Sequence, residues 1–258
     1  MTSRTTNIRR GAAFRPSPVF LGLLALWITG AVMAWMEFGN ATFNLILFVL
    51  AGWVVSLSLH EYSHALFAYR SGDHSVAARG YLTLNPLKYT HPVLSIGLPL
   101  LFLLIGGIGL PGGAVWVDRH AVRGKLNASL ISAVGPGANI ALFVLLMIPF
   151  ALGLDDSAHP TFWAAVAFLA FLQLTAAVLN LLPVPGLDGG NIARPWLSPS
   201  AGRVFDTVAP FGMLILLGIL FVPVLGDIFW AVVLGLSDLF GLPRSLIAAG
   251  LDTLQFWR

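Results

Sequence analysis

The chain has 258 residues, of which 57% are hydrophobic and only 10% charged, whereas soluble domains contain roughly 45–50% apolar and about 25% charged residues. This composition excludes an ordinary soluble domain and predicts an integral membrane protein. There is no cysteine, so a bound metal must be held by nitrogen or oxygen ligands. The formal net charge of +3 reflects membrane topology and does not predict nucleic-acid binding.

Six apolar stretches approach the length of about 20 residues that a helix needs to cross a bilayer. They lie at about 18–35, 43–69, 127–152, 161–183, 207–225 and 228–243. The stretches predict an all-α polytopic membrane protein with about six transmembrane helices.

A further apolar run, at about 93–110, is interrupted by Pro99, Gly106, Gly107 and Gly109 and is followed by Pro111-Gly112-Gly113. Such interruptions disfavour one regular spanning helix. We predict that residues 93–117 form a membrane-embedded re-entrant hairpin with a short β segment. Such a hairpin is tolerated at that depth where protein or a wet cavity satisfies its backbone.

The lysines and arginines are distributed unevenly between the two faces that these helices define. If the hairpin returns to the face it left, all 14 cations lie on one face, and the opposite loops carry acidic residues alone. Basic loops stay in the cytoplasm. We therefore predict a multi-pass protein of the cell membrane with its N- and C-termini in the cytoplasm.

The sequence His60-Glu61-Tyr62-Ser63-His64 lies in the last third of the second predicted helix. Residues at i and i+4 share one helix face, so His60 and His64 can bind one zinc ion while Glu61 takes a proton from bound water. The alternative is a pair of buried histidines without a metal. Three ionisable groups within five residues of an apolar span are costly to bury without a function, which favours the zinc site.

A catalytic zinc site commonly has three protein ligands and one open position. Asp188 follows the fourth predicted helix at its cytoplasmic end, at the depth of His60 and His64, and is the candidate for the third ligand. The pair Asp188-Gly189 is equally typical of an ordinary turn at a helix end. Spacing alone leaves both interpretations open.

The motifs of this chain resemble those of the site-2 protease family of intramembrane zinc metalloproteases. The resemblance covers most of residues 50–200, and it rests on His60-Glu61-x-x-His64, Gly135-Pro136-Gly137-Ala138-Asn139 and Asn180-x-x-Pro183-x-Pro185-x-Leu187-Asp188-Gly189. The chain is similar to a compact prokaryotic branch without PDZ or CBS modules. It departs from that branch at Tyr89-Thr90-His91-Pro92, where relatives often have His-Ile-Asp-Pro.

The resemblance implies one Zn²⁺ per chain, held by His60, His64 and Asp188, with Glu61 as the general base. The implied reaction is hydrolysis of a peptide bond in a transmembrane segment of a membrane-protein substrate near the cytoplasmic face, as in regulated intramembrane proteolysis. The implied partners are that substrate and the lipid bilayer, with no nucleic acid.

The domain organisation expected from the resemblance is a single integral membrane metalloprotease domain over residues 1–258. Its catalytic core would cover about 43–190. The accessory helices would lie at 18–35 and 207–243.

Five further residues are candidates for contact with substrate. The side-chain amides of Asn139 and Asn180 are available to donate to a developing oxyanion, but Asn139 is equally suited to a contact between closely packed helices. Gly112, Gly113 and Ala114 would offer an edge strand to an unwound substrate segment, or they form the tip of the hairpin.

Two other functions are compatible with an intramembrane metal motif. A metal transporter would carry ionisable residues at several depths, whereas this chain gathers them near one face and shows no obvious repeat. A catalytically inactive scaffold would not need Glu61. Both remain alternatives to the protease.

Overall fold

The computed structural model describes residues 14–89, 97, 101 and 115–257. These residues form helices and loops, with no β-strand among them. The helical elements are α2 (Pro18–Trp35), α3 (Ala41–Arg70), α4 (Ser75–Ala78), η1 (Tyr81–Thr83), η2 (Pro86–Lys88), α6 (Lys125–Ala151), α7 (Pro160–Leu181), α8 (Asp188–Ala193), η4 (Arg194–Trp196), α9 (Pro199–Val208), η5 (Ala209–Phe211), α10 (Gly212–Phe221), α11 (Pro223–Leu239) and α12 (Arg244–Leu254).

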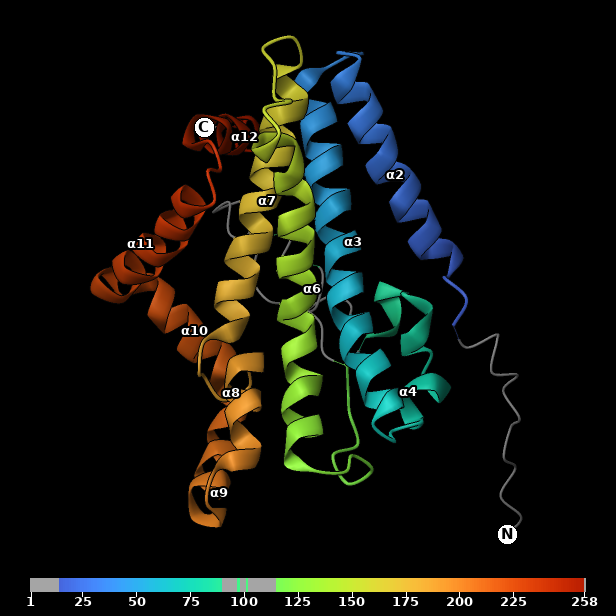
Figure 1. The fold of residues 1–258 in the computed structure, drawn as a ribbon, viewed down its shortest axis with the longest axis vertical. Helices are drawn as coiled ribbons and strands as arrows, with labels where there is room; N and C mark the ends of the chain where they lie inside the picture. Colours follow the sequence, from blue (N-terminus) through green and yellow to red (C-terminus); the bar gives the residue numbers. More distant parts are fainter. Residues whose placement is uncertain (1–13, 90–96, 98–100, 102–114, 258) are drawn as a thin grey trace.

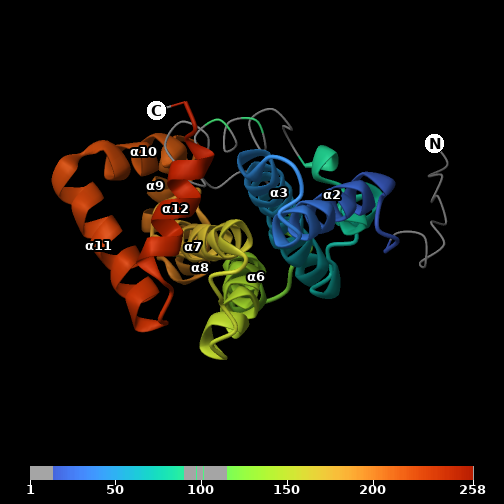
Figure 2. The ribbon, with the colours of Figure 1, turned by 90° about the horizontal axis from the view of Figure 1, so that it is seen from above.

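The centre of the molecule is built from α3, α6 and α7, which run side by side (Figures 1 and 2). Helix α7 is the most enclosed, with 89% of its apolar stretch buried, whereas α2 lies on the outside of α3 with 17% buried. Gly30 of α2 packs directly against the backbone of Phe48, where a Cβ would lie 2.8 Å from the Phe48 nitrogen. Small residues permit such close helix approach.

Five helical segments of the described chain are long and apolar enough to cross a membrane, by length and composition. They are Pro18–Trp35, Ala41–Arg70, Lys125–Ala151, Pro160–Leu181 and Pro199–Phe221. The first four coincide with predicted stretches to within two residues at each end. The all-helical class is therefore confirmed for the described residues.

The last two predicted helices, 207–225 and 228–243, differ from the structure. A helical segment already begins at Pro199, and α10 ends at Phe221 because Pro223 follows and leaves Val222 extended (φ −77°, ψ 116°). Helices α10 and α11 meet at an angle, and both run from the end of the bundle that holds α9 toward the end that holds α12 (Figure 1). In this part of the described chain, one segment, Pro199–Phe221, is long and apolar enough to cross a membrane, where the sequence predicts two.

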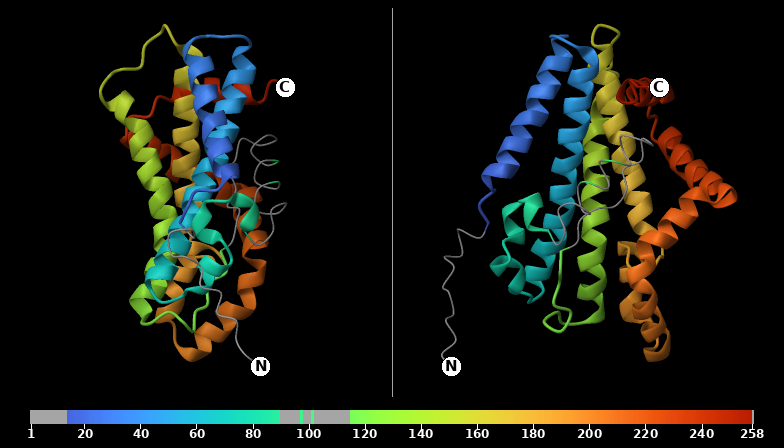
Figure 3. Two further views of the ribbon diagram at one scale, coloured as in Figure 1. Left: turned by 90° about the vertical axis from the view of Figure 1, so that its right-hand side faces the viewer. Right: turned by 180° about the vertical axis from the view of Figure 1, so that it is seen from behind.

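The C-terminal helix packs beside the beginning of α7. Helix α12 packs on the first half of α7, where a Cβ on Gly250 would lie 2.5 Å from the Phe168 Cβ. Near the other end of the chain, the Phe14 ring contacts Tyr69 at the end of α3, with centroids 5.4 Å apart. Helix α12 therefore lies near the end of the bundle where α7 begins (Figure 3), whereas Phe14 lies beside the last residues of α3.

The hairpin predicted at 93–117 falls almost entirely outside the described residues, and so do Gly112, Gly113 and Ala114. The described residues of this segment are 97 and 101, which are helical, and 115–117, which have no regular secondary structure.

Candidate metal centre

Helix α3 places the histidine motif inside the bundle. The helix is started by Asn40, whose side chain accepts a hydrogen bond from the Phe43 nitrogen (2.9 Å), and it continues to Arg70. His60, Glu61 and His64 lie in its second half and are all buried. The 3.6-residue period puts His60 and His64 on one face, one turn apart.

Asp188 reaches the same place from the loop that follows α7. It is the first residue of α8, and the next two residues, Gly189 and Gly190, lie against the carbonyls of Leu181 and Val184 with no room for a Cβ. Only glycine allows α8 to fold back so tightly on the loop that precedes it. The turn geometry and the metal-ligand interpretation of the Asp-Gly pair are therefore compatible.

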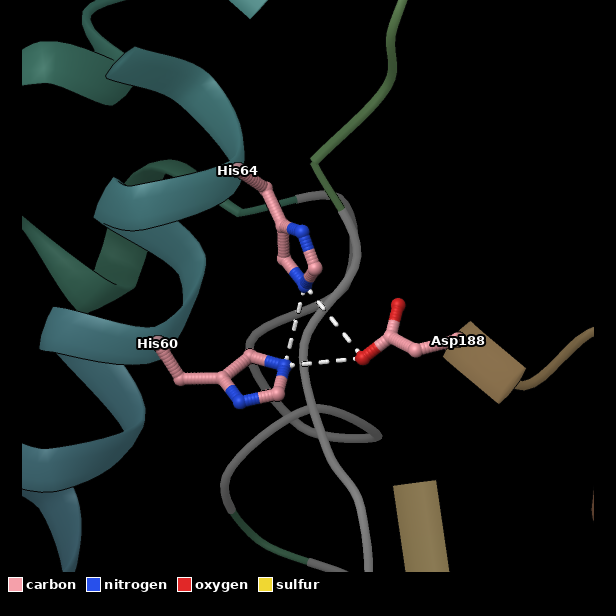
Figure 4. Close-up of side chains that lie close together, drawn as sticks. All are labelled: His60, His64 and Asp188. Carbon is pink, nitrogen blue, oxygen red and sulfur yellow. Dashed lines mark hydrogen bonds and ion pairs between the residues drawn. The ribbon is translucent and has the colours of Figure 1, made fainter. Parts of the chain in front are cut away.

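Three ligand atoms converge between α3 and α8 (Figure 4). The Nε2 atoms of His60 and His64 are 3.0 Å apart, and the Asp188 Oδ2 lies 3.2 Å from the first and 3.4 Å from the second. Among the described residues this is the one group of His, Asp or Glu side chains close enough to hold a metal ion.

Hydrogen bonds on the far side of each imidazole orient the two rings. The Nδ1 of His60 lies 2.6 Å from Asn139 Oδ1, and the Nδ1 of His64 lies 2.5 Å from the carbonyl oxygen of Ile131. Both acceptors require a proton on Nδ1. Each Nε2 therefore directs a lone pair at the other and at Asp188.

Three lone-pair-bearing atoms at this spacing repel one another unless a cation lies among them. Zinc–ligand bonds of about 2.0–2.1 Å at tetrahedral angles place neighbouring ligands about 3.3 Å apart, close to the three separations in this group. Burial disfavours ionisation of Asp188, but His64 and His60 more than offset this effect and hold the pKa of that carboxyl below its usual range. Two imidazole nitrogens and one carboxylate oxygen at these separations therefore fit the donor set of a zinc site.

Helix α6 closes the third side of this group through a glycine. A Cβ on Gly135 would meet His64 Nε2 and would lie 2.7 Å from His60 Nε2. Ile131, Gly135 and Asn139 follow one another at intervals of four residues and share the face of α6 that is turned to α3. The glycine motif thus leaves the space that the metal would occupy.

A cavity of about 850 Å³ opens onto the metal centre and contains Glu61 in its wall. The Glu61 Oε2 accepts a hydrogen bond from the backbone nitrogen of Val115 (3.1 Å). Asn139 and Asn180 also line the cavity. Asn139 uses its oxygen for His60, whereas the Asn180 side-chain nitrogen donates to the Ala176 carbonyl within α7 (3.0 Å).

A buried aspartate that the sequence analysis did not select anchors the segment beside Glu61. Asp73 Oδ2 accepts from the Asp118 nitrogen (2.8 Å), and its Oδ1 accepts from the Ser75 nitrogen (2.9 Å). This carboxylate is 1% exposed, so it ties the chain that carries Val115 to the end of α3. The sequence feature that could have identified Asp73 is its position as an acidic residue directly after the Ser71-Gly72 turn.

Comparisons with known proteins identify the relatives of the chain. The family model described as peptidase family M50 matches residues 146–222. The chain is 48% identical over 247 residues to Rip2 of Mycobacterium tuberculosis, with 94% of this chain and 95% of that protein covered. It is 30% identical over 190 residues to YwhC of Bacillus subtilis, with 71% and 84% covered. Both relatives carry the name of a zinc metalloprotease. No solved structure matches the chain.

These features define a zinc metalloprotease embedded in a helical membrane bundle. The chain belongs to the M50 peptidase family, the site-2 protease family, as its motifs predict. The chain is also 45% identical over 251 residues to Rip2 of Mycolicibacterium smegmatis, with 94% of this chain and 95% of that protein covered.

Proposed function

We propose that the chain is an intramembrane protease that hydrolyses a peptide bond in the transmembrane segment of a membrane-protein substrate, in regulated intramembrane proteolysis. The observation that carries the proposal is the position of the metal centre. His60 and His64 belong to an apolar helix of 30 residues, yet they face a cavity that also reaches polar residues such as Arg119. A substrate segment that leaves the bilayer can meet both water and the ligands there.

The proposed roles follow from the geometry of each side chain. His60, His64 and Asp188 hold zinc, which when bound lowers the pKa of water to about 7 and polarises the scissile carbonyl. Glu61 lines the same cavity as the three ligands, and its Oε2 accepts a hydrogen bond from the Val115 nitrogen. In this position its carboxylate would accept the proton of the attacking water and pass it to the leaving amine.

The substrate contacts belong to this proposal as well. Asn180 is placed in the cavity wall with its nitrogen partly engaged, and it is the better candidate for contact with the oxyanion. Gly112, Gly113 and Ala114 precede the described Val115, whose backbone lies beside Glu61. This sequence position supports their proposed role as an edge on which an unwound substrate segment pairs.

The decisive experiment separates chemistry from metal binding. Glu61→Gln keeps the size and hydrogen bonding of the side chain but cannot accept a proton, so it should retain zinc and lose cleavage by about 10²–10⁴-fold. Cleavage of a single-span substrate in proteoliposomes is measured together with zinc content on one preparation. Cleavage at the parental rate would overturn the assignment of Glu61, and loss of zinc would make it a ligand.

The same experiment addresses the two alternative functions. A scaffold would show no cleavage in the parental protein. A transporter would move zinc across the proteoliposome membrane, and Glu61→Gln would alter that flux. The described residues contain a single metal group and no second one along the bundle, which favours the protease over a transport path.

For orientation, we propose that the metal centre lies near the cytoplasmic face, with the N-terminus on that side. The loops at this end carry most of the cations, including Arg70, Lys88 and Arg123, whereas the loop at 152–159 carries two aspartates. Reporters fused near residue 120 should be found inside and near residue 155 outside. Helix α12 packs on the first half of α7, which begins directly after the 152–159 loop. A reporter after residue 258 should therefore also be outside. An inside location would support the prediction that both termini are cytoplasmic.

A further inference from the structure

A buried chain of polar side chains runs outward from His60 through all three central helices. His60 Nδ1 contacts Asn139 Oδ1 (2.6 Å), Asn139 Nδ2 donates to Gln173 Oε1 (2.8 Å), and Gln173 Nε2 donates to Ser56 Oγ (3.0 Å). The Ser56 hydroxyl in turn donates to the Trp53 carbonyl (2.8 Å). The three side chains beyond His60 are at most 3% exposed.

Ser56, at the end of this hydrogen-bond chain away from His60, sets which group donates and which accepts along it. The hydroxyl proton of Ser56 is used by a backbone carbonyl, so Ser56 Oγ accepts, and the amide of Gln173 must turn its nitrogen toward it. The Gln173 oxygen then faces Asn139 and receives its nitrogen, which leaves the Asn139 oxygen for His60. Each side-chain amide could present either its oxygen or its nitrogen. Ser56 fixes the orientation of Gln173, and Gln173 fixes that of Asn139.

The opposite direction would be incompatible with the metal centre. If the Asn139 amide were turned over, its nitrogen would donate to His60 Nδ1, and the imidazole proton would move to Nε2. That proton would occupy the position of the lone pair aimed at His64 and Asp188. A neutral histidine in this tautomer cannot be a zinc ligand through Nε2.

We propose that Gln173 and Ser56 are positioning residues of the zinc centre, which orient the Asn139 amide and so hold His60 in the tautomer that binds metal. The inference rests on the proposed assignment of His60 as a zinc ligand. Hydrogen-bond partners of this kind commonly change metal affinity by 10–100-fold when they are removed. The role of Asn139 is thereby also specified: it supports a ligand through its oxygen.

Interhelical packing is the competing role for the same residues, because an amide pair between α6 and α7 also holds helices together. The two roles predict different outcomes for a carboxylate at position 139. An aspartate can only accept a hydrogen bond from His60 and needs no orienting partner. It therefore makes Gln173 dispensable for zinc binding, but it does not replace a lost helix contact.

The test is a set of zinc-affinity measurements on purified protein in detergent or nanodiscs, by competition with a chromogenic chelator. Gln173→Met, which keeps the side-chain length but has no amide, should weaken zinc binding by about 10–100-fold. Asn139→Asp should stay within about threefold of the parental affinity, and Asn139→Asp combined with Gln173→Met should match it. Ligand-field absorption of the Co²⁺-loaded variants reports the ligand geometry independently of activity.

Two controls keep the outcomes distinct. Thr175→Val removes another buried polar group from α7, one that bonds only within its own helix, and it should bind zinc with the parental affinity. His60→Ala should lose zinc; parental affinity in that variant would refute the ligand assignment itself. Parental affinity in Gln173→Met, or a double variant as weak as Gln173→Met, would overturn the positioning role while leaving the protease proposal intact.

Discussion

Two helical segments border the same cavity and differ in how they are packed. Helix α7 has 89% of its apolar stretch buried, whereas the segment Pro199–Phe221, which includes α10, has 11%. The inner wall, which α7 forms together with α3 and α6, carries the histidine ligands and the groups that contact them, and the outer wall contributes residues such as Gly212 and Met213. The comparison separates an inner wall that sets the chemistry from an outer wall that we expect to affect access.

The strongest test of the inner wall is Gly135→Ala. Its methyl group would lie at the position where the metal is expected, in contact with both histidine Nε2 atoms, so zinc binding should fall below detection and cleavage with it. Elemental analysis of the purified variant measures the loss.

Gly137→Ala is the matched control on the same helix, because a Cβ there meets nothing within 4 Å. It should keep full zinc and parental cleavage. Full zinc in Gly135→Ala would show that the metal lies elsewhere.

An intermediate effect is expected where the outer wall touches the loop that carries Asp188. A Cβ on Gly212 would meet the carbonyl of Pro185 and lie 3.3 Å from Gly186 Cα. Gly212→Ala should displace this loop slightly and reduce cleavage by about 10-fold, less than the 10²-fold that a 1 Å misplacement can cause. Gly218→Ala, with open space around it, should be neutral in the same assay. Equal rates for the two variants would show that α10 does not influence the site.

The smallest effect is expected at the exposed end of the outer wall. Arg194 pairs with Asp206 through two nitrogens, at 2.7 Å for Nε and 2.5 Å for Nη2. Exposed ion pairs contribute about 0.2–1 kcal/mol, so Asp206→Asn should lower the thermal midpoint by a few degrees at most and leave cleavage unchanged. A loss of activity would indicate that this ion pair holds α9 in a position that the reaction requires.

Much of the inner wall could be predicted from the sequence. Continuous apolar stretches located four helices within two residues, and the i, i+4 histidines with Asp188 identified the group that the fold brings together. Gln173 was overlooked although a lone amide inside the stretch 161–183 is itself a signal. The role of Gln173 depends on its hydrogen bonds to Asn139 and Ser56, which belong to two other helices. The periodicity of one helix does not predict which residues of other helices it will contact.

The outer wall was predicted less well for a physical reason. The stretches 207–225 and 228–243 satisfy the length and hydropathy of spanning helices, but these properties do not specify the direction in which a helix leaves a break. At Val222-Pro223 the angle between α10 and α11 depends on packing, including that of α12 against α7. The predicted C-terminal orientation depended on counting two crossings there.

The distance along the chain between the metal ligands has a consequence for folding. Residues 60 and 64 belong to α3, whereas residue 188 follows α7, so a bound ion ties together two parts of the chain that α6 and α7 separate. A ligand that binds only the folded state stabilises it by about 2.7 kcal/mol at 100 times its Kd. Zinc supply is therefore expected to govern the lifetime of the protease in the membrane, because chain made without the ion lacks this cross-link and opens between α3 and α8 more readily.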